Sequence, residues 1–275
     1  MKRAFFGALD VLASNANDLD LTGDESSAEL VTSLASELSD IESSIGVTHS
    51  IYQSRVAYFL VCAEHVMNQL TEETIERVVL PITQRHLSES NNREIYEAAH
   101  SVMLAIFATS ESSPIPSHKP SPLSRAHLLV PAYIKILLQE SDEGKLSSDQ
   151  LCLAFQALVR AAGSRGDELS WFCVEELKVA INQFSNNFDQ SSGSTPNERA
   201  LRLQLALISS ISVVPAPELL RLLKTIRDQL VHCTNSRDAL AKATHHEIME
   251  RLGDREKDQA LEWWMKLENE VRSIH

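Results

Sequence analysis

The densest group of side chains that could bind a metal ion lies in the stretch His245-His246-Glu247-Ile248-Met249-Glu250. Zinc peptidases of the His-Glu-x-x-His type place two imidazoles on one helical face, around a carboxylate that acts as general base. In this chain the residue four positions after His246 is Glu250, and no third ligand is evident. The spacing favours two surface histidines near a helix end, and no metal site is predicted.

Motifs for covalent catalysis and nucleotide binding are missing from the sequence. There is no Gly-x-Ser-x-Gly elbow, and Gly163-Ser164-Arg165-Gly166 predicts a tight turn between helices. There is also no Walker loop and no Gly-x-Gly-x-x-Gly. The members of a serine triad scatter along a sequence, and nothing points to one here. We therefore expect a protein that is not an enzyme and uses no cofactor.

Trp263 and Trp264 are the candidate protein-binding residues. Adjacent residues are about 100° apart on a helix, so both rings can be buried only in a groove or at a helix end. We expect one ring to close the final helix pair and the other to be exposed. Exposed Trp is enriched at binding hot spots. For the pair taken together, burial in helix packing is the interpretation that we favour.

The composition predicts a helical protein with a substantial core. Hydrophobic residues make up 43% of the 275 residues, with only 8 Gly and 9 Pro. Low glycine with abundant Leu, Ala, Glu and Ser favours helices over turn-rich sheets. The four cysteines, Cys62, Cys152, Cys173 and Cys233, stand far apart among apolar neighbours, so each is predicted to be a small buried hydrophobic residue.

Charge is distributed unevenly along the chain. The formal net charge is −13, and residues 1–50 hold two basic and nine acidic side chains. An acidic surface repels phosphate backbones, and no basic stripe is visible that would indicate a nucleic-acid partner. The acid excess fits two interpretations, solubility or an arm that contacts a basic partner, and we favour solubility. The longest apolar run, Val56–Ala63, is far shorter than a membrane span requires.

Hydrophobic periodicity predicts one or two N-terminal amphipathic helices followed by five helix pairs. The N-terminal helices are Lys2–Ala13 and Ser26–Ile45, and they form a predicted acidic extension over residues 1–48, with a helical-repeat domain over residues 49–275. The predicted pairs are His49–Leu70 with Thr71–Leu87, Asn92–Thr109 with Leu123–Gln139, Ser147–Ala162 with Asp167–Phe184, Asn197–Ser212 with Ala216–His232, and Ser236–Leu252 with Asp254–Ser273.

The spacing of these pairs predicts an all-α solenoid of the HEAT or armadillo type. Without the linker sequences Ser110–Pro122 and Ser185–Thr195, the pairs recur near the ~40–47 residues of such repeats. Pro81 and Pro131 each lie near the middle of the second helix of a pair. Proline there is expected to bend the helix, which suits a curved stack. Chance coincidence of two proline-containing helices is the alternative.

Five segments resemble the fungal intraperoxisomal peroxin family, peroxin-8, in matching order over roughly residues 50–270. They are Thr74–Pro81 (TIERVVLP), Tyr96–Phe107, Tyr133–Leu138, Leu151–Arg160, and Gly253–Glu256 (GDRE) with Trp263-Trp264. These are packing motifs, so the resemblance carries no catalytic residue with it.

The resemblance implies a helical-repeat adaptor on the lumenal face of the peroxisomal membrane, attached through its partners. The implied partners are the import receptor for C-terminal targeting signals, the docking complex and the RING-finger peroxins, and the implied roles include cargo release. A generic cytosolic helical-repeat adaptor is the alternative function.

One feature of the sequence departs from the family pattern. Many members end in a Ser-Lys-Leu-type tripeptide, whereas this sequence ends in Ser273-Ile274-His275. This departure leaves two expectations. Either the chain is a shortened member of the family that enters the peroxisome with a partner, or its location is not the peroxisome.

Overall fold

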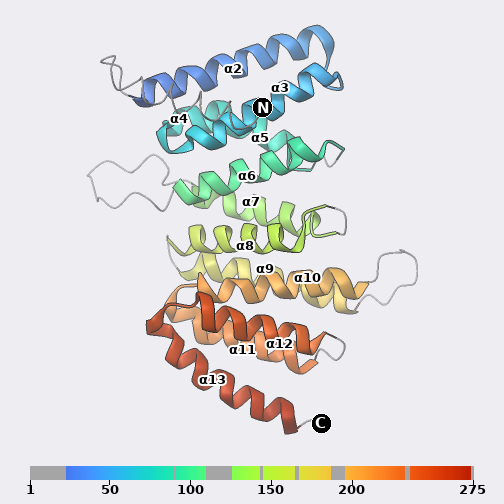
Figure 1. Cartoon of the computed structure of the whole chain (residues 1–275), viewed down its shortest axis with the longest axis vertical. Helices are drawn as coiled ribbons and strands as arrows, with labels where there is room; N and C mark the ends of the chain where they lie inside the picture. The colour runs from blue at the N-terminus through green and yellow to red at the C-terminus, as the bar shows by residue number, and fades with distance from the viewer. Residues whose placement is uncertain are drawn as a thin grey trace. The chain divides into compact units, whose positions relative to one another are not determined.

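The computed structural model describes residues 23–88, 91–109, 126–142, 145–164, 167–186, 196–232 and 236–273. These residues form helices joined by turns and contain no β-strand (Figure 1). The contacts divide the chain into two compact units, Met1–Arg125 and Ala126–His275. The predicted all-α helical-repeat class is confirmed. The predicted helix Lys2–Ala13 lies outside the described residues.

Unit 1 is built from antiparallel helices in which each element covers an apolar face of the next. Its elements are α2 (Gly23–Ile45), α3 (Ser50–Val66), the 3₁₀ turn η1 (Met67–Gln69), α4 (Glu72–Thr74), the π-helical turn η2 (Ile75–Val79), α5 (Leu80–His86) and α6 (Arg93–Thr109). Helix α2 packs on α3, and α3 packs on α6. The predicted amphipathic helix Ser26–Ile45 is therefore part of α2. The proposed domain boundary at residue 48 falls in the turn between α2 and α3 and stays a prediction.

Helix α6 is buried around most of its circumference, as the sequence indicated for Tyr96–Phe107. Tyr96 and Phe107 are completely enclosed. Helices α3 and α5 both pack against α6, because a helix with so little polar surface needs cover on more than one side. Burying one large apolar side chain stabilises a fold by about 1.5–3 kcal/mol, so α6 anchors unit 1.

A π turn precedes Pro81 in its helix, and the sequence did not predict this kind of distortion. The predicted continuous helix Thr71–Leu87 is interrupted by the π turn η2, in which the amide of Leu80 donates to the carbonyl of Ile75. Proline has no N–H to donate and crowds the preceding turn, and a π turn relieves that conflict by widening the helix locally. In unit 2, Pro131 lies inside α7 without such a turn.

Unit 2 continues the pattern of paired helices. Its elements are α7 (Ala126–Gln139), α8 (Ser148–Gly163), α9 (Asp167–Asn186), α10 (Pro196–Ser209), the 3₁₀ turn η4 (Ser210–Ser212), α11 (Ala216–His232), α12 (Arg237–His246), the π turn η5 (Glu247–Arg251) and α13 (Asp254–Ser273). Helix α10 packs on both α8 and α9, and α11 packs on α13. The predicted pair Asn92–Thr109 and Leu123–Gln139 corresponds to α6 and α7, which belong to different units.

Helix ends follow the signals in the sequence. The Ser147 hydroxyl accepts the amide of Gln150 at 3.1 Å, and the Gln150 side chain accepts the amide of Ser147 at 2.9 Å, which completes a capping box on α8. Thr71 caps α4 by accepting the amide of Thr74 at 3.3 Å. Gly253 separates η5 from α13, as predicted.

Gly163, the last residue of α8, allows the close approach of the segment between η4 and α11. A Cβ atom at this position would lie 2.9 Å from Cγ of Pro215. The proline ring cannot rotate away, so any side chain here forces helix and turn apart.

We predict that Gly163→Ala destabilises the chain by about 1–3 kcal/mol, as overpacking does elsewhere. Urea unfolding followed by circular dichroism measures the change. Gly253→Ala is the matched control, because its Cβ would meet only the mobile carboxylate of Glu256, at 3.1 Å. Equal shifts of the unfolding midpoint in the two variants would contradict the proposed contact.

Candidate interaction surface

The turn between α2 and α3 has a fixed geometry. Gly46 adopts a positive φ of 80°, a conformation that residues with a Cβ rarely accept, and its amide donates to the carbonyl of Glu42 at 3.0 Å. His49 then caps α3, because its Nδ1 accepts the amide of Ile51 at 3.2 Å. The turn therefore presents its neighbouring side chains in one defined arrangement.

Helix α2 is tied to the rest of unit 1 through Glu42. This carboxylate accepts the Tyr52 hydroxyl of α3 at 3.5 Å and lies 3.4 Å from the Arg85 guanidinium of α5. The hydroxyl of Ser27, at the other end of α2, donates to the Gln69 amide oxygen. Two separated polar links and the apolar face between them hold α2 in register on α3.

Three large apolar side chains around the turn are exposed to solvent. Ile45, Val47 and Ile51 are 42%, 51% and 54% exposed. Beside them an open hollow of about 340 Å³ is lined by Ser50, Ile51, Ser54, Arg55 and Tyr58. We call the three apolar residues and the lining of this hollow the α2–α3 corner. An apolar surface with a concave part is suited to holding a partner side chain.

The polar groups of the corner remain accessible. The guanidinium of Arg55 lies 3.9 Å from the carboxylate of Glu37, and both side chains are about half exposed. Such a pair contributes little stability, so it can rearrange when a partner arrives. Burial raises the pKa of Tyr58, and the neighbouring Cys62 adds to the shift.

The sequence prediction did not find this surface. Ile45 was assigned to the apolar face of an amphipathic helix, whereas it extends beyond the end of the buried face. The available signal was Ile45-Gly46-Val47, in which two apolar residues flank a turn glycine where polar residues are usual.

The predicted protein-binding residues Trp263 and Trp264 lie together on α13. Their ring centroids are 6.3 Å apart, and the Trp264 ring lies 5.7 Å from that of His245 on α12. Both side chains are half-buried, so neither ring is fully exposed and neither is fully enclosed. The imidazole of His245 lies near the Trp264 ring, and the two indole rings lie near each other.

The residues of the candidate metal stretch point in different directions. His245 and His246 are exposed, whereas Glu247 is buried and accepts the Ser212 hydroxyl at 2.6 Å and the Gln156 amide at 3.3 Å. These contacts link α8, η4 and η5 within unit 2. Across the described ranges, no three His, Cys, Asp or Glu side chains are grouped so that they could hold a metal ion.

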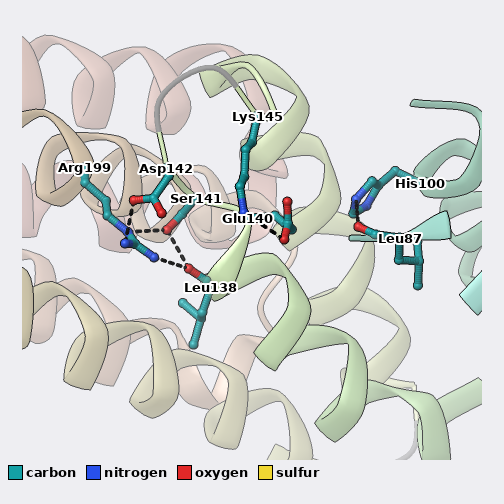
Figure 2. A network of polar contacts seen from close by, with 8 residues as sticks. All are labelled: Leu87, His100, Leu138, Glu140, Ser141, Asp142, Lys145 and Arg199. Atoms are coloured by element: carbon teal, nitrogen blue, oxygen red, sulfur yellow. Dashed lines mark hydrogen bonds and ion pairs between the residues drawn. The ribbon is translucent and has the colours of Figure 1, made fainter. Parts of the chain in front are cut away.

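A second polar cluster closes the C-terminal end of α7. Figure 2 shows the Arg199 guanidinium of α10, which donates to the Leu138 carbonyl at 2.8 Å and to the Ser141 hydroxyl at 2.9 Å. It also pairs with Asp142 at 2.5 Å. Burial lowers the pKa of Arg199, and the carboxylate of Asp142 opposes that shift. Because the last carbonyls of a helix lack partners within it, Arg199 acts here as a structural clamp.

The cysteines of the described residues are free, and burial makes their thiols unreactive. Burial raises the pKa of Cys173 to about 12 and that of Cys152 to about 11. Burial also raises the pKa of Cys62. The thiolate is the nucleophile, so thiols that stay protonated are weak nucleophiles at neutral pH. Cys233 lies outside the described residues.

Fold and surface together define an all-α helical-repeat protein with surfaces suited to protein contacts. Residues 27–108 match the family model of the PEX8 central TPR-like domain, from early in α2 to the end of α6. The match covers less than a third of the chain. It supports assignment to the peroxin-8 family and confirms the resemblance found in the sequence, of which the segments Thr74–Pro81 and Tyr96–Phe107 lie inside the matched range. No curated protein and no solved structure matches the chain. None of the helices described is long and apolar enough to cross a membrane.

His100 of α6 is a buried titratable group inside the matched segment. Its Nε2 lies 3.2 Å from the Leu87 carbonyl (Figure 2), and its ring meets that of Tyr96 edge to face at 4.8 Å. Burial lowers its pKa to about 4, although the bond to the Leu87 carbonyl favours the charged form. The imidazole is therefore neutral in the folded chain at physiological pH.

We predict that His100 makes unit 1 sensitive to mild acid. The unfolded imidazole binds a proton below a pKa of about 6.5, whereas the folded one resists it until about 4, so the contribution is complete above pH 6.5 and declines as the pH falls toward 4. The loss amounts to roughly 3 kcal/mol. Urea unfolding at several pH values measures it. His100→Gln keeps a donor for Leu87 but does not titrate, and an equally steep pH dependence in that variant would contradict the assignment.

Proposed function

We propose that the chain is a non-enzymatic scaffold in peroxisomal matrix-protein import. The observation that carries this proposal is the match of residues 27–108 to the PEX8 central TPR-like domain, which supports a role in peroxisomal import and an association with peroxisomes. The fold is consistent with it, because stacked helical repeats offer extended surfaces for several partners at once.

The finer part of the proposal concerns the partners and the location. We infer that the chain links the receptor-docking complex to the RING-finger ligase complex on the lumenal face of the membrane, and that it aids release of cargo from the receptor for C-terminal targeting signals. The resemblance of the sequence to peroxin-8 supports this inference. In this role the two units can hold different partners, since each has its own core.

The location of the chain in a fungal cell tests the proposal most directly. A fluorescent protein inserted at Ser191-Ser192-Gly193 leaves both ends of the chain free. We expect punctate fluorescence that coincides with a peroxisomal matrix marker and resists protease added to permeabilised cells until the peroxisomes are lysed. A diffuse cytosolic signal would contradict the proposal and favour a general cytosolic adaptor.

We further propose Trp263 and Trp264 as a protein-binding site of unit 2. We expect Trp263→Ala to weaken binding of the purified docking or RING-finger components at least about tenfold, as truncation of a hot-spot residue does. Titration calorimetry measures the affinity. The control is Met265→Ala, because Met265 is more exposed than either tryptophan and lies on the same helix. Unchanged affinity in Trp263→Ala, with an unchanged melting temperature, would exclude this site.

A further inference from the structure

Three of the nine large exposed apolar side chains in the described ranges stand close together in the sequence, around one turn. Ile45, Val47 and Ile51 stand within seven residues of one another at the α2–α3 corner. The other large exposed apolar residues each lie on a different element: Leu128, Leu153, Val179, Leu220, Met249 and Met265. Single exposed apolar residues are ordinary, whereas a group beside a hollow indicates a contact surface.

The charge of the described part of unit 1 is predominantly negative. The described residues of unit 1 contain 12 acidic side chains and 4 arginines, and the sequence has no lysine between residues 3 and 118. Each arginine already lies beside a carboxylate: Arg55 by Glu37, Arg77 by Glu73, Arg85 by Glu42 and Arg93 by Glu97. The described residues of unit 1 therefore have an excess of eight carboxylates over arginines, which attracts cationic partners and repels acidic ones.

We propose that the α2–α3 corner binds a basic amphipathic helix of a partner protein. The apolar stripe of that helix would cover Ile45, Val47 and Ile51, and one of its side chains would enter the hollow beside Tyr58. Its lysines or arginines would face the carboxylates of α2, with Glu37 and Asp40 exposed on that helix. This is the helix-in-groove mode of recognition, with affinity from the apolar anchors and selectivity from charge.

The dimensions of the hollow suit this occupant. Ile51, Ser54, Arg55 and Tyr58 occupy positions i, i+3, i+4 and i+7 of α3, so they share one face of that helix. A space of about 340 Å³ is at the small end of ligand pockets and open to solvent, which fits one or two side chains better than a whole small molecule.

The inference goes beyond the proposed function, because it names the chemistry of a partner and not its identity. It holds for any protein that presents a helix of this kind. Its failure and the failure of the import proposal are therefore separable. Peptide binding with a diffuse cellular location would leave the corner intact and remove the import role.

Fluorescence anisotropy with synthetic peptides tests the proposal on the full chain. The probe is a labelled peptide of leucine and lysine, long enough for about four helical turns, with all leucines on one face. Its controls are the same residues with the leucines spread around the helix, and a leucine–glutamate peptide with the original pattern. We expect the probe to bind at least about tenfold tighter than either control, and its affinity to fall as ionic strength rises.

Two matched variants locate the binding. We expect Ile51→Ser to weaken the probe about tenfold, and Leu153→Ser to leave it unchanged, although Ile51 and Leu153 are both 54% exposed. Thermal melting of each variant shows whether it is folded. If Ile51→Ser fails to fold, Ile51→Lys takes its place. The added lysine stays solvated at this exposed site, and its charge repels the cationic probe.

Three results would overturn the proposal. Equal losses of probe affinity in Ile51→Ser and Leu153→Ser would show non-specific binding to exposed apolar residues. A dimer of the chain that Ile51→Ser dissociates, detected by analytical ultracentrifugation, would assign the corner to a second copy. Tighter probe binding by Phe6→Ser would assign the corner to the chain's own segment Lys2–Ala13. In that case the Phe6 side chain competes with the probe for the corner, and its removal makes the corner available to the probe.

Discussion

The structure depends on one constraint, which is that another helix must cover each apolar helix face. Helix α6 presents almost no polar side, so α3 and α5 must both lie against it. In unit 2, α8 is similarly enclosed by α7, α9 and α10. If the helices that cover it are also apolar on their outer sides, further helices must cover those sides in turn. Only a helix with a polar outer face can end this series of stacked helices. Helix α2, with serine, threonine and carboxylate side chains outside, has that character.

The helices of both units could be predicted from the sequence because their signals are local. Apolar steps of three and four residues, the cap at Ser147 and the break at Gly253 each depend on a few neighbouring residues. The π turn before Pro81 could not be predicted, since the sequence shows only that a proline interrupts the hydrogen bonds and not how the backbone compensates. The division at residue 125 was also missed, because it depends on contacts between distant residues.

The candidate surfaces were harder to predict for a related reason. Ile45 and Leu38 are both apolar residues of α2, yet Leu38 is buried and Ile45 is exposed, and the difference depends on where α3 begins to cover α2. Glu247 illustrates the opposite case. Its neighbours His245 and His246 suggested a surface cluster, but hydrogen bonds from Ser212 and Gln156 compensate its burial. Exposure of a single side chain is set by tertiary packing, which spacing alone does not encode.

The absence of lysine between residues 3 and 118 has a chemical consequence besides charge. Ubiquitin is transferred to the ε-amino group of lysine, and arginine cannot replace it as an acceptor. The four arginines of the described part of unit 1 supply cations without supplying acceptors. A scaffold that holds a ubiquitin ligase beside the described part of unit 1 would thus expose the ligase to a surface that it cannot modify through lysine. Modification would be directed to the bound partner instead.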